Sequence, residues 1–210
     1  MAQRAVRSTL AGLAVAAATL TAVAVPAASA QAATLPNFRV GLQVADGGGF
    51  GGAGVEKFTT YAKFGGSTSD WATDSDYYDP DAVLVDLAAA PSGVLGAVDF
   101  RIGVQARESD GHLGPAEFTP WASQGGGTSP LATDDDGYDP DGYRVIVETR
   151  AWTAPFTPDD FRLSVEAVDG GIAGVPAFTP WASQGGGKSQ YAIDSDGYDP
   201  DGIRVGLEVY

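Results

Sequence analysis

The sequence predicts an all-β protein built from three related repeats around a shared core. Segments at the start and end of each repeat alternate apolar and polar residues with a period of two, which is typical of strands with one buried face. Landmarks also recur at a step of sixty residues, at Phe58, Phe118 and Phe178. After the N-terminal segment, no stretch of useful length has a helical period. Triplication and period-two alternation together define the fold class.

Each repeat opens with a strongly patterned strand: FRVGLQV from Phe38, FRIGVQA from Phe100 and FRLSVEA from Phe161. A second patterned segment closes each repeat, as in IRVGLEV from Ile203. Between them, FTPWAS and SQYAID of the third repeat predict two weaker strands joined by a glycine-rich turn. The pattern therefore predicts four strands in each repeat and twelve in all.

Residues 31–210 are expected to form a single domain from repeats at about 37–88, 99–149 and 160–210. A repeat of this length cannot bury its apolar face alone, so the three must share one core. A β-trefoil would build a barrel from the patterned strands and a cap from the weaker ones. A β-prism would make each repeat its own four-stranded sheet, and a two-sheet sandwich is the remaining alternative.

Residues 1–30 have the pattern of a secretory signal peptide. Arg4 and Arg7 precede an apolar run that starts at Leu10, and Ala28-Ser29-Ala30 offers a small-x-small cleavage site. We therefore expect an extracellular protein without membrane insertion. Scarce lysine and abundant Ala, Gly and Asp suggest a bacterial source.

The chain is acidic and has no cysteine, with 27 Asp and Glu against 12 Lys and Arg and a net charge of −15. Such a surface repels nucleic acid and anionic lipid, so these partners are excluded, whereas neutral ligands and divalent cations fit. Without disulfides the fold must be held by its core, alone or with metal ions.

The string FTPWASQGGG occurs at 118–127 and again at 178–187, while the neighbouring loops differ. We call these segments, with the related residues 58–67, the Trp-Gly strings. An aromatic ring beside a run of glycines is suited to a sugar, whose C–H face stacks on the ring while backbone amides bond its hydroxyls. A buried tryptophan before a hairpin turn is the other interpretation. The expected ligand-binding residues are Tyr61, Trp121, Gln124, Gly125, Gly126, Gly127, Tyr138, Trp181, Gln184, Gly185, Gly186, Gly187 and Tyr198.

A second shared segment, DDDGYDPDG in repeat two, concentrates carboxylates at 74–82, 134–142 and 194–202. Asp-Pro-Asp-Gly suits a type I turn, but the carboxylates just before it repel one another unless a cation binds them. Turn formation alone and calcium binding in at least one repeat both stay open, and the spacing is not that of an EF-hand. The expected metal ligands in these Asp-rich strings are Asp74, Asp76, Asp79, Asp81, Asp134, Asp136, Asp139, Asp141, Asp194, Asp196, Asp199 and Asp201.

Catalytic machinery is scarce in this sequence. The only histidine, His112, lies in a variable loop, and GGGKS at 185–189 lacks the first glycine of a phosphate-binding loop. Repeated acidic strings favour several weak binding sites over one catalytic pair. We expect a non-enzymatic, lectin-like protein that binds a glycan or polysaccharide, with calcium as a candidate cofactor. Each site would pair the Trp-Gly and Asp-rich strings of one repeat, with repeat one altered. The alternative is a non-catalytic interaction protein that binds a secreted protein partner, as a component of a secreted assembly or as an enzyme inhibitor. Its Asp-rich strings would then hold structural calcium or only form turns.

Overall fold

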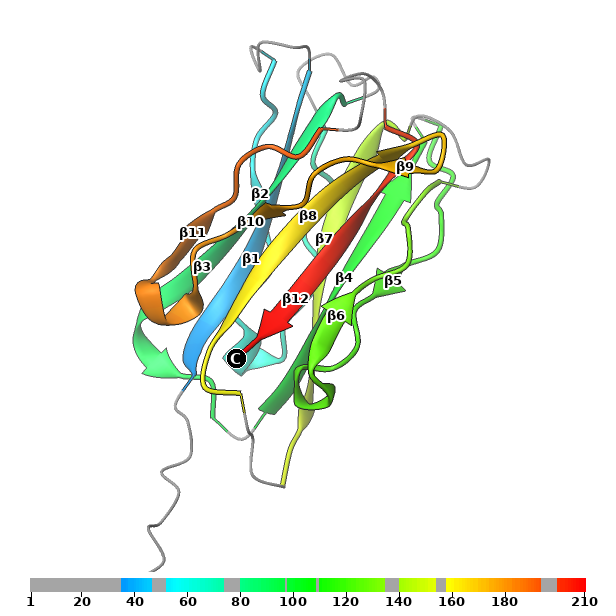
Figure 1. The fold of residues 1–210 in the computed structure, drawn as a ribbon. Coiled ribbons are helices and arrows are strands. Elements are labelled where there is room, and N and C mark those ends of the chain that lie inside the picture. Colours follow the sequence, from blue (N-terminus) through cyan, green and yellow to red (C-terminus); the bar gives the residue numbers. More distant parts are fainter. Residues whose placement is uncertain are drawn as a thin grey trace, which may run out of the picture. The chain divides into compact units, whose positions relative to one another are not determined.

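The computed structural model describes residues 35–46, 52–73, 80–96, 98–108, 110–134, 140–153, 158–193 and 200–210. Within these residues the regular elements are strands and three short 3-10 turns, so the predicted all-β class is confirmed (Figure 1). All strand pairing is antiparallel. The strands are β1 (Pro36–Ala45), β2 (Lys57–Phe58), β3 (Ala82–Val94), β4 (Val98–Arg107), β5 (Glu117–Phe118), β6 (Gly126–Thr128), β7 (Gly142–Ala151), β8 (Phe161–Asp169), β9 (Ile172–Ala173), β10 (Ala177–Phe178), β11 (Gly186–Lys188) and β12 (Gly202–Val209).

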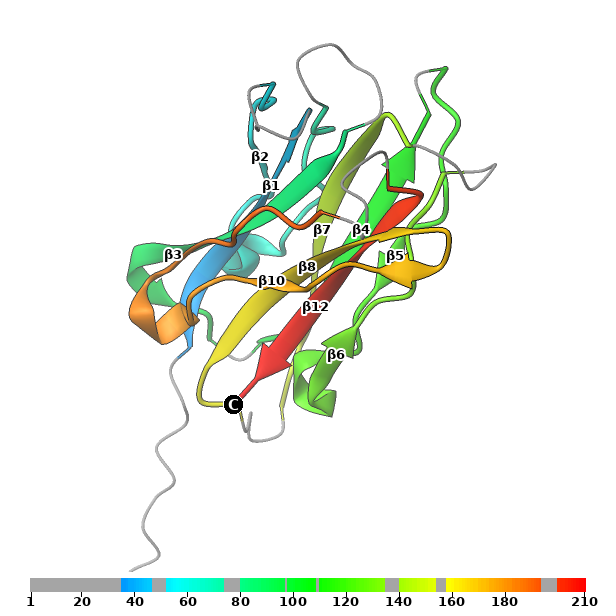
Figure 2. The ribbon, with the colours of Figure 1, turned by 45° about the horizontal axis from the view of Figure 1, so that its top comes forward.

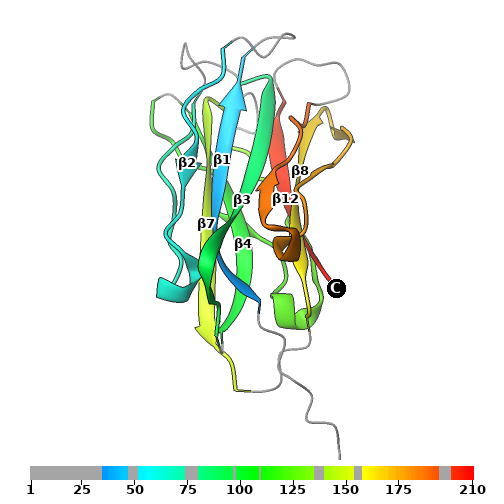
Figure 3. The ribbon, with the colours of Figure 1, turned by 90° about the vertical axis from the view of Figure 1, so that its left-hand side faces the viewer.

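Each sequence repeat contributes one long pair of antiparallel strands. The pairs are β1 with β3, β4 with β7, and β8 with β12, and they join the first and last patterned segments of each repeat. Figure 3 shows the β1–β3 pair beside the β8–β12 pair, and residues of β3 contact β8. In the same way β7 contacts β1, and β12 contacts β4. Every sheet therefore faces the other two.

Three phenylalanine rings meet where the sheets face one another. The Phe38 centroid lies 4.7 Å from that of Phe100 and 4.7 Å from that of Phe161, and the other two are 4.9 Å apart. All three side chains are fully buried, and one apolar core includes residues of all three repeats. The shared core predicted from the repeat length is thus present, with the first apolar residue of each repeat at its centre.

The short strands of a repeat do not all join the sheet of that repeat. The first short strand of each repeat pairs with its own long strand: β2 with β1, β5 with β4, and β10 with β8. The later part of each repeat instead crosses to another repeat. β6 of the second repeat pairs with β12 of the third (Figure 2), and β11 of the third pairs with β3 of the first (Figure 1). Thr68 of the first repeat bridges to Ile146 of the second, which closes the cycle.

This exchange corrects two predictions. A prism in which each repeat is its own four-stranded sheet is wrong. One outer strand of the β1–β3 sheet and one of the β8–β12 sheet come from another repeat, and at the β4–β7 sheet isolated bridges from the first repeat take that place. The weaker strands are also shorter than predicted. The FTPWAS strand ends at Phe178 because Pro180 has no N–H to continue the ladder, and residues Ala182–Gln184 form a 3-10 turn, η3. The following strand lies at Gly186–Lys188, before SQYAID rather than within it.

An ion pair reinforces the exchange between the third and first repeats. Lys188 of β11 lies opposite Asp86 of β3, and its Nζ is 2.8 Å from Glu56 Oε2. Burial and repulsion by Glu56 raise the pKa of Asp86 from 3.8 to about 6, although Lys188 and Arg39 oppose the shift. At this contact Lys188 and Arg39 therefore face the two carboxylates Glu56 and Asp86.

The predicted signal peptide at 1–30 lies outside the described residues. Of the residues that are described, none belongs to a helix with the length and apolar character needed to cross a bilayer.

Replacing the central Phe100 with alanine should lower the free energy of unfolding by about 3–5 kcal/mol, because the cavity would lie where three sheets meet. Phe64→Ala is the matched control, since Phe64 is 77% exposed and its loss should cost less than about 0.5 kcal/mol. Urea denaturation followed by circular dichroism measures both changes. Equal losses would show that the phenylalanine cluster is not the centre of stability.

Asp86 should make the protein less stable as pH rises from about 4 to 6. In this range the folded state retains a proton that the unfolded chain has lost, so the free energy of unfolding falls as pH rises. The expected fall is on the order of 1 kcal/mol, because Asp86 is only half-buried and water screens the repulsion. Asp86→Asn should remove this fall, whereas Asp70→Asn, at an exposed site, should leave it. Identical pH profiles for the two variants, from denaturation at a series of pH values, would contradict this assignment.

Candidate functional site

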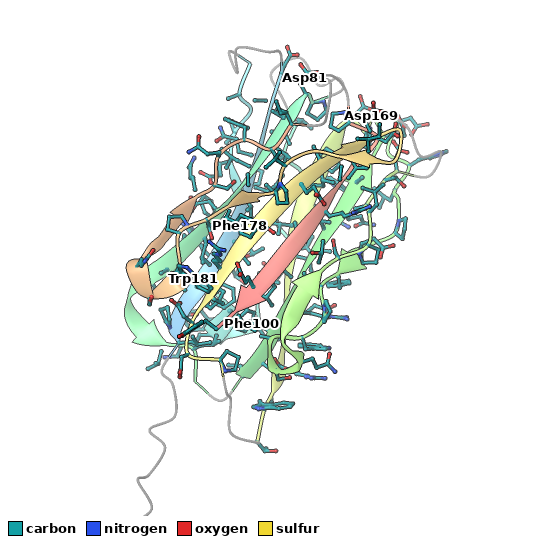
Figure 4. All side chains as sticks on the ribbon, in the orientation of Figure 1. Asp81, Phe100, Asp169, Phe178 and Trp181 are labelled. Atoms are coloured by element: carbon teal, nitrogen blue, oxygen red, sulfur yellow. The ribbon has the colours of Figure 1, made fainter. Side chains whose placement is uncertain are left out.

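The Trp-Gly strings and the Asp-rich strings lie at opposite ends of the sheets. Ser123, in the Trp-Gly string of repeat two, donates its backbone N–H to Asp99 at the start of β4, 2.9 Å away. The Asp-rich string of this repeat leads into β7 at Gly142. Gly142 pairs with Arg107, which is the last residue of β4. The ten residues of β4 span about 30 Å. Figure 4 shows the same separation in repeat three, with Trp181 at one end of the sheet and Asp169, the last residue of β8, at the other.

The predicted composite site, in which both strings of a repeat bind one ligand, is therefore wrong. The weak strand between them was expected to be short enough to bring them together. Residues 126–134 instead run the length of the neighbouring sheet, since Thr128 pairs with Gly206 and Ala132 bridges to Ile203. Each string must be considered as a site by itself.

The Trp-Gly strings have a structural role that accounts for much of their identity. Thr119 accepts a hydrogen bond at Oγ1 from the Ile102 N–H of its own repeat, over 3.1 Å. Ten residues later, Ser129 accepts one at Oγ from the Val205 N–H of the next repeat, also over 3.1 Å. The other two repeats make the same two bonds, through Thr59 and Ser69 and through Thr179 and Ser189. We call the segments 59–69, 119–129 and 179–189 the arms. Each arm is thus bonded at one end to its own repeat and at the other end to a different repeat.

The glycine run serves the crossing between repeats. Gly126 has φ +64°, and a Cβ there would lie 2.2 Å from the carbonyl oxygen of Leu207 on β12. Gly186 has the same relation to Leu87, at 1.9 Å. The close approach predicted from three consecutive glycines is therefore real, but the approaching group is the backbone of another repeat. Gly125 and Gly185 end the preceding turns, and Gly127 and Gly187 pack against the proline of their own string.

In all three repeats an arginine side chain lies against the aromatic ring that was expected to stack on sugar. The Arg101 and Arg150 guanidinium carbons lie 4.9 and 4.0 Å from the Trp121 ring centroid. Arg39 lies 5.4 Å from Tyr61. In repeat three the ring of Trp181 contacts Arg162, at 4.8 Å, and Tyr210. In this structure the aromatic rings of the Trp-Gly strings therefore make cation–π contacts with arginine side chains of the protein itself.

The remaining residues of the predicted ligand site are divided. Gln124 and Gln184 are exposed, and Gln184 lines a hollow of about 250 Å³ with Asp160, Trp181 and Tyr210. Gly125 and Gly127 line a separate hollow of about 310 Å³ beside Phe178. Tyr138 and Tyr198 lie outside the described residues.

Four of the twelve predicted metal ligands lie within the described residues. These are Asp81, Asp134, Asp141 and Asp201, of which the first three are buried. The other eight, Asp74, Asp76, Asp79, Asp136, Asp139, Asp194, Asp196 and Asp199, lie outside the described residues. The described part of the chain holds no group of three metal-binding side chains.

Sequence analysis overlooked an acidic residue at the end of each first long strand. The pairing of Ala45 with Ala82, of Arg107 with Gly142 and of Val168 with Gly202 sets the strand register. This register places one such acid opposite the last aspartate of each Asp-rich string: Asp46 with Asp81, Glu108 with Asp141, and Asp169 with Asp201. The signal was present, since an acid stands two positions after the patterned segment in every repeat, in the strings VAD, ARE and AVD.

The carboxylates of repeat two interact strongly. A hydrogen bond with Asp134, burial, and repulsion by Asp134 and Asp141 raise the pKa of Glu108 to about 8. Asp134 and Asp141 themselves are buried, at 3% and 5% exposure. Negative charge is thus concentrated at the end of the β4–β7 pair, where a cation would relieve the repulsion.

Repeat three differs from the others by an exposed apolar surface. Val175, Pro176, Phe178, Tyr191 and Ile193 line a hollow of about 640 Å³. Ser164 stands under Phe178 where the other repeats have glycine under their phenylalanine, and Phe178 is 43% exposed. We call these five residues the repeat-three apolar surface.

Comparisons with protein-family models, with curated proteins and with solved structures found no match to this chain.

Gly126→Ala should lower the free energy of unfolding by at least about 2 kcal/mol, because the new Cβ would collide with the Leu207 carbonyl and adopt a left-handed backbone. Gly125→Asn is the matched control, since the space around Gly125 is open and asparagine tolerates positive φ. Its cost should stay below about 1 kcal/mol. Thermal denaturation measures both, and equal effects would contradict the role of Gly126 in the crossing.

Proposed function

We propose that this protein is a secreted, non-catalytic carbohydrate-binding protein whose ligand is bound, with calcium, at the Asp-rich end of the sheets. The observation that carries the proposal is the repeated pairing of acids across the ends of the long strands. The strand register brings an acid at the end of β1, β4 or β8 to the Asp-rich string of the same repeat. The proposal thus moves the ligand site away from the Trp-Gly strings, whose residues fasten the repeats together.

Calcium is supported by the charge and oxygen chemistry of this end. Carboxylates are the hard oxygen ligands that calcium prefers, and it takes six to eight oxygens in all. In repeat two Glu108 interacts with Asp134 and with Asp141, which raises the pKa of Glu108, but these three side chains do not by themselves form a metal-binding group. Further aspartates of the same string, at 135, 136 and 139, are available close by in sequence. A bound cation would turn their repulsion into binding energy.

A carbohydrate is the ligand that best fits an acidic, cation-bearing end. Sugar hydroxyls can complete a calcium shell as water does, and carboxylates accept hydrogen bonds from the remaining hydroxyls. The strong negative charge of the chain disfavours anionic ligands but does not repel neutral sugars. Up to three related sites, at one end of three sheets, would raise the affinity for a polysaccharide through multivalency.

The strand exchange also bears on the choice between fold alternatives. Three sheets that face one another around the phenylalanine cluster favour a prism-like arrangement with exchanged outer strands over a trefoil or a two-sheet sandwich.

An interaction protein is the second candidate, and the repeat-three apolar surface favours it. Exposed Val175 and Phe178 border a hollow that is lined mainly by apolar side chains. Such a surface is more typical of protein contacts than of sugar contacts. In this case the acidic end would serve only for turns or for structural calcium.

A glycan and polysaccharide screen of residues 31–210, in calcium and again in chelator, tests the first proposal. Binding should require calcium and should fall at least about tenfold in a D81N/D141N/D201N variant, because each site loses a charged ligand. Q124A/Q184A is the matched control, because both side chains are exposed in the Trp-Gly strings, and its binding should be unchanged.

Two results would overturn this assignment. Loss of binding in Q124A/Q184A but not in the aspartate variant would return the ligand to the Trp-Gly strings. Absence of glycan binding in both buffers would reject the carbohydrate function, and capture of a secreted partner that is lost in V175D would then support the interaction protein.

A further inference from the structure

The second repeat contains an arginine that is held by a carboxylate and a tryptophan. Arg150, at the end of β7, places its guanidinium carbon 4.0 Å from the Trp121 ring centroid. Its Nη2 lies 2.8 Å from Asp99 Oδ2, and its Nε donates to the same oxygen over 2.9 Å. Ser123 donates to Asp99 through both its N–H and its hydroxyl. The acid Asp99 is fully buried, and Arg150 supplies its countercharge.

The third repeat has the same acid and tryptophan but lacks the arginine. Asp160 occupies the place of Asp99, and Ser183 donates to it through the N–H and the hydroxyl, as Ser123 does in repeat two. Trp181 corresponds to Trp121. The residue that corresponds to Arg150 is Tyr210, whose N–H donates to the Asp160 carbonyl over 2.9 Å.

A hollow stands where the guanidinium lies in repeat two. It measures about 250 Å³ and is lined by Asp160, Trp181, Gln184 and Tyr210 (Figure 4 labels Trp181). The rings of Trp181 and Tyr210 meet edge to face, with centroids 6.3 Å apart and planes at 73°. The hollow thus has two aromatic walls and a carboxylate, the combination that binds organic cations.

The first repeat shows what happens when no cation is required. Asparagine stands there in place of the acid: Asn37 accepts the Lys63 N–H at Oδ1 over 2.9 Å. Alanine, Ala90, stands in place of Arg150. The charge at this place is neutralised in both repeats: repeat two has an acid with an arginine, and repeat one has a neutral amide and no arginine. Repeat three keeps the acid, and among the described residues no cationic side chain forms an ion pair with Asp160, since Arg162 pairs with Glu208.

We propose that this hollow of repeat three binds the guanidinium group of an arginine side chain presented by a partner. Asp160 accepts its N–H groups as Asp99 does from Arg150, and the rings of Trp181 and Tyr210 lie beside the planar cation. The acidic net charge of the chain favours a cationic partner. The site is independent of the proposed carbohydrate function, because it lies at the other end of the sheets from the Asp-rich strings.

Titration with N-acetyl-arginine amide, followed by NMR, tests the site directly. The four tryptophans give four indole N–H signals, and W181F identifies that of Trp181. N-acetyl-citrulline amide is the matched probe, because it has the same shape without the charge. We expect the arginine probe to shift the Trp181 signal with a dissociation constant in the millimolar range. The citrulline probe should bind at least about tenfold more weakly.

Two variants connect this response with the proposed residues. D160N introduces the amide that repeat one tolerates, and Y210R supplies the arginine that repeat two uses, so both should fold. Each should weaken binding of the arginine probe at least about tenfold, because one removes the countercharge and the other fills the hollow from within. R150Y should create a hollow of the same kind in repeat two. The arginine probe should then shift the indole signal of Trp121 as well as that of Trp181.

The proposal fails if the arginine and citrulline probes shift Trp181 equally, or if Y210R binds the arginine probe as the unmodified protein does. Circular dichroism of Y210R and D160N confirms that both are folded before either result is interpreted. A negative glycan screen would leave these outcomes unaffected, so the two proposals can fail separately.

Discussion

The contact of three phenylalanine rings is the constraint on which the rest of the structure depends. Phe38, Phe100 and Phe161 are each the first inward residue of a repeat, and each is fully buried against the other two. A single long strand pair has one apolar face and no element of its own repeat to cover it. Three such pairs facing one another solve this problem for all of them at once. Because the rings fix where the pairs begin, they also align the ends of the strands, and with them the Trp-Gly and Asp-rich strings.

The cyclic exchange of the arms follows from the same need for closure. Two residue pairs per repeat, such as Thr119 with Ile102 and Ser129 with Val205, fasten each arm to its own sheet and to the next. Glycine at 126 or 186 is required where the arm passes the neighbouring backbone. The threonine, the serine and the crossing glycine make these contacts in every repeat, so their identity needs no ligand. Repeat one nevertheless has Tyr61, Lys63 and Phe64 where the other two copies have Trp, Ser and Gln. The loops that contact neither sheet differ between the repeats.

Differences between the repeats are therefore the better guide to function. The exchange of Arg150 for Tyr210 leaves Asp160 with a hollow in front of it, whereas the same place in repeat two is filled by the chain itself. The repeat-three apolar surface arises in the same way, since Ser164 replaces a glycine and Phe178 becomes exposed. Both features gather on one repeat, so pseudo-symmetry supports the fold while its breaking creates distinct surfaces.

The sequence by itself determined the strand class, the three repeats and the shared core, because a period of two and a step of sixty residues are local patterns that survive without knowledge of contacts. The sequence also contains acids that could have located the Asp-rich end, at Asp46, Glu108 and Asp169, had the end of each first long strand been considered. Only the tertiary structure decided which sheet receives each arm. Hydrogen bonds such as that from the Val205 N–H to Ser129 join residues 76 positions apart, and no local pattern specifies such a partner. For the same reason only the tertiary structure shows that the Trp-Gly and Asp-rich strings of repeat two lie a β4 length apart, and that Arg150 lies on the ring of Trp121. Both features depend on strand pairing between distant segments.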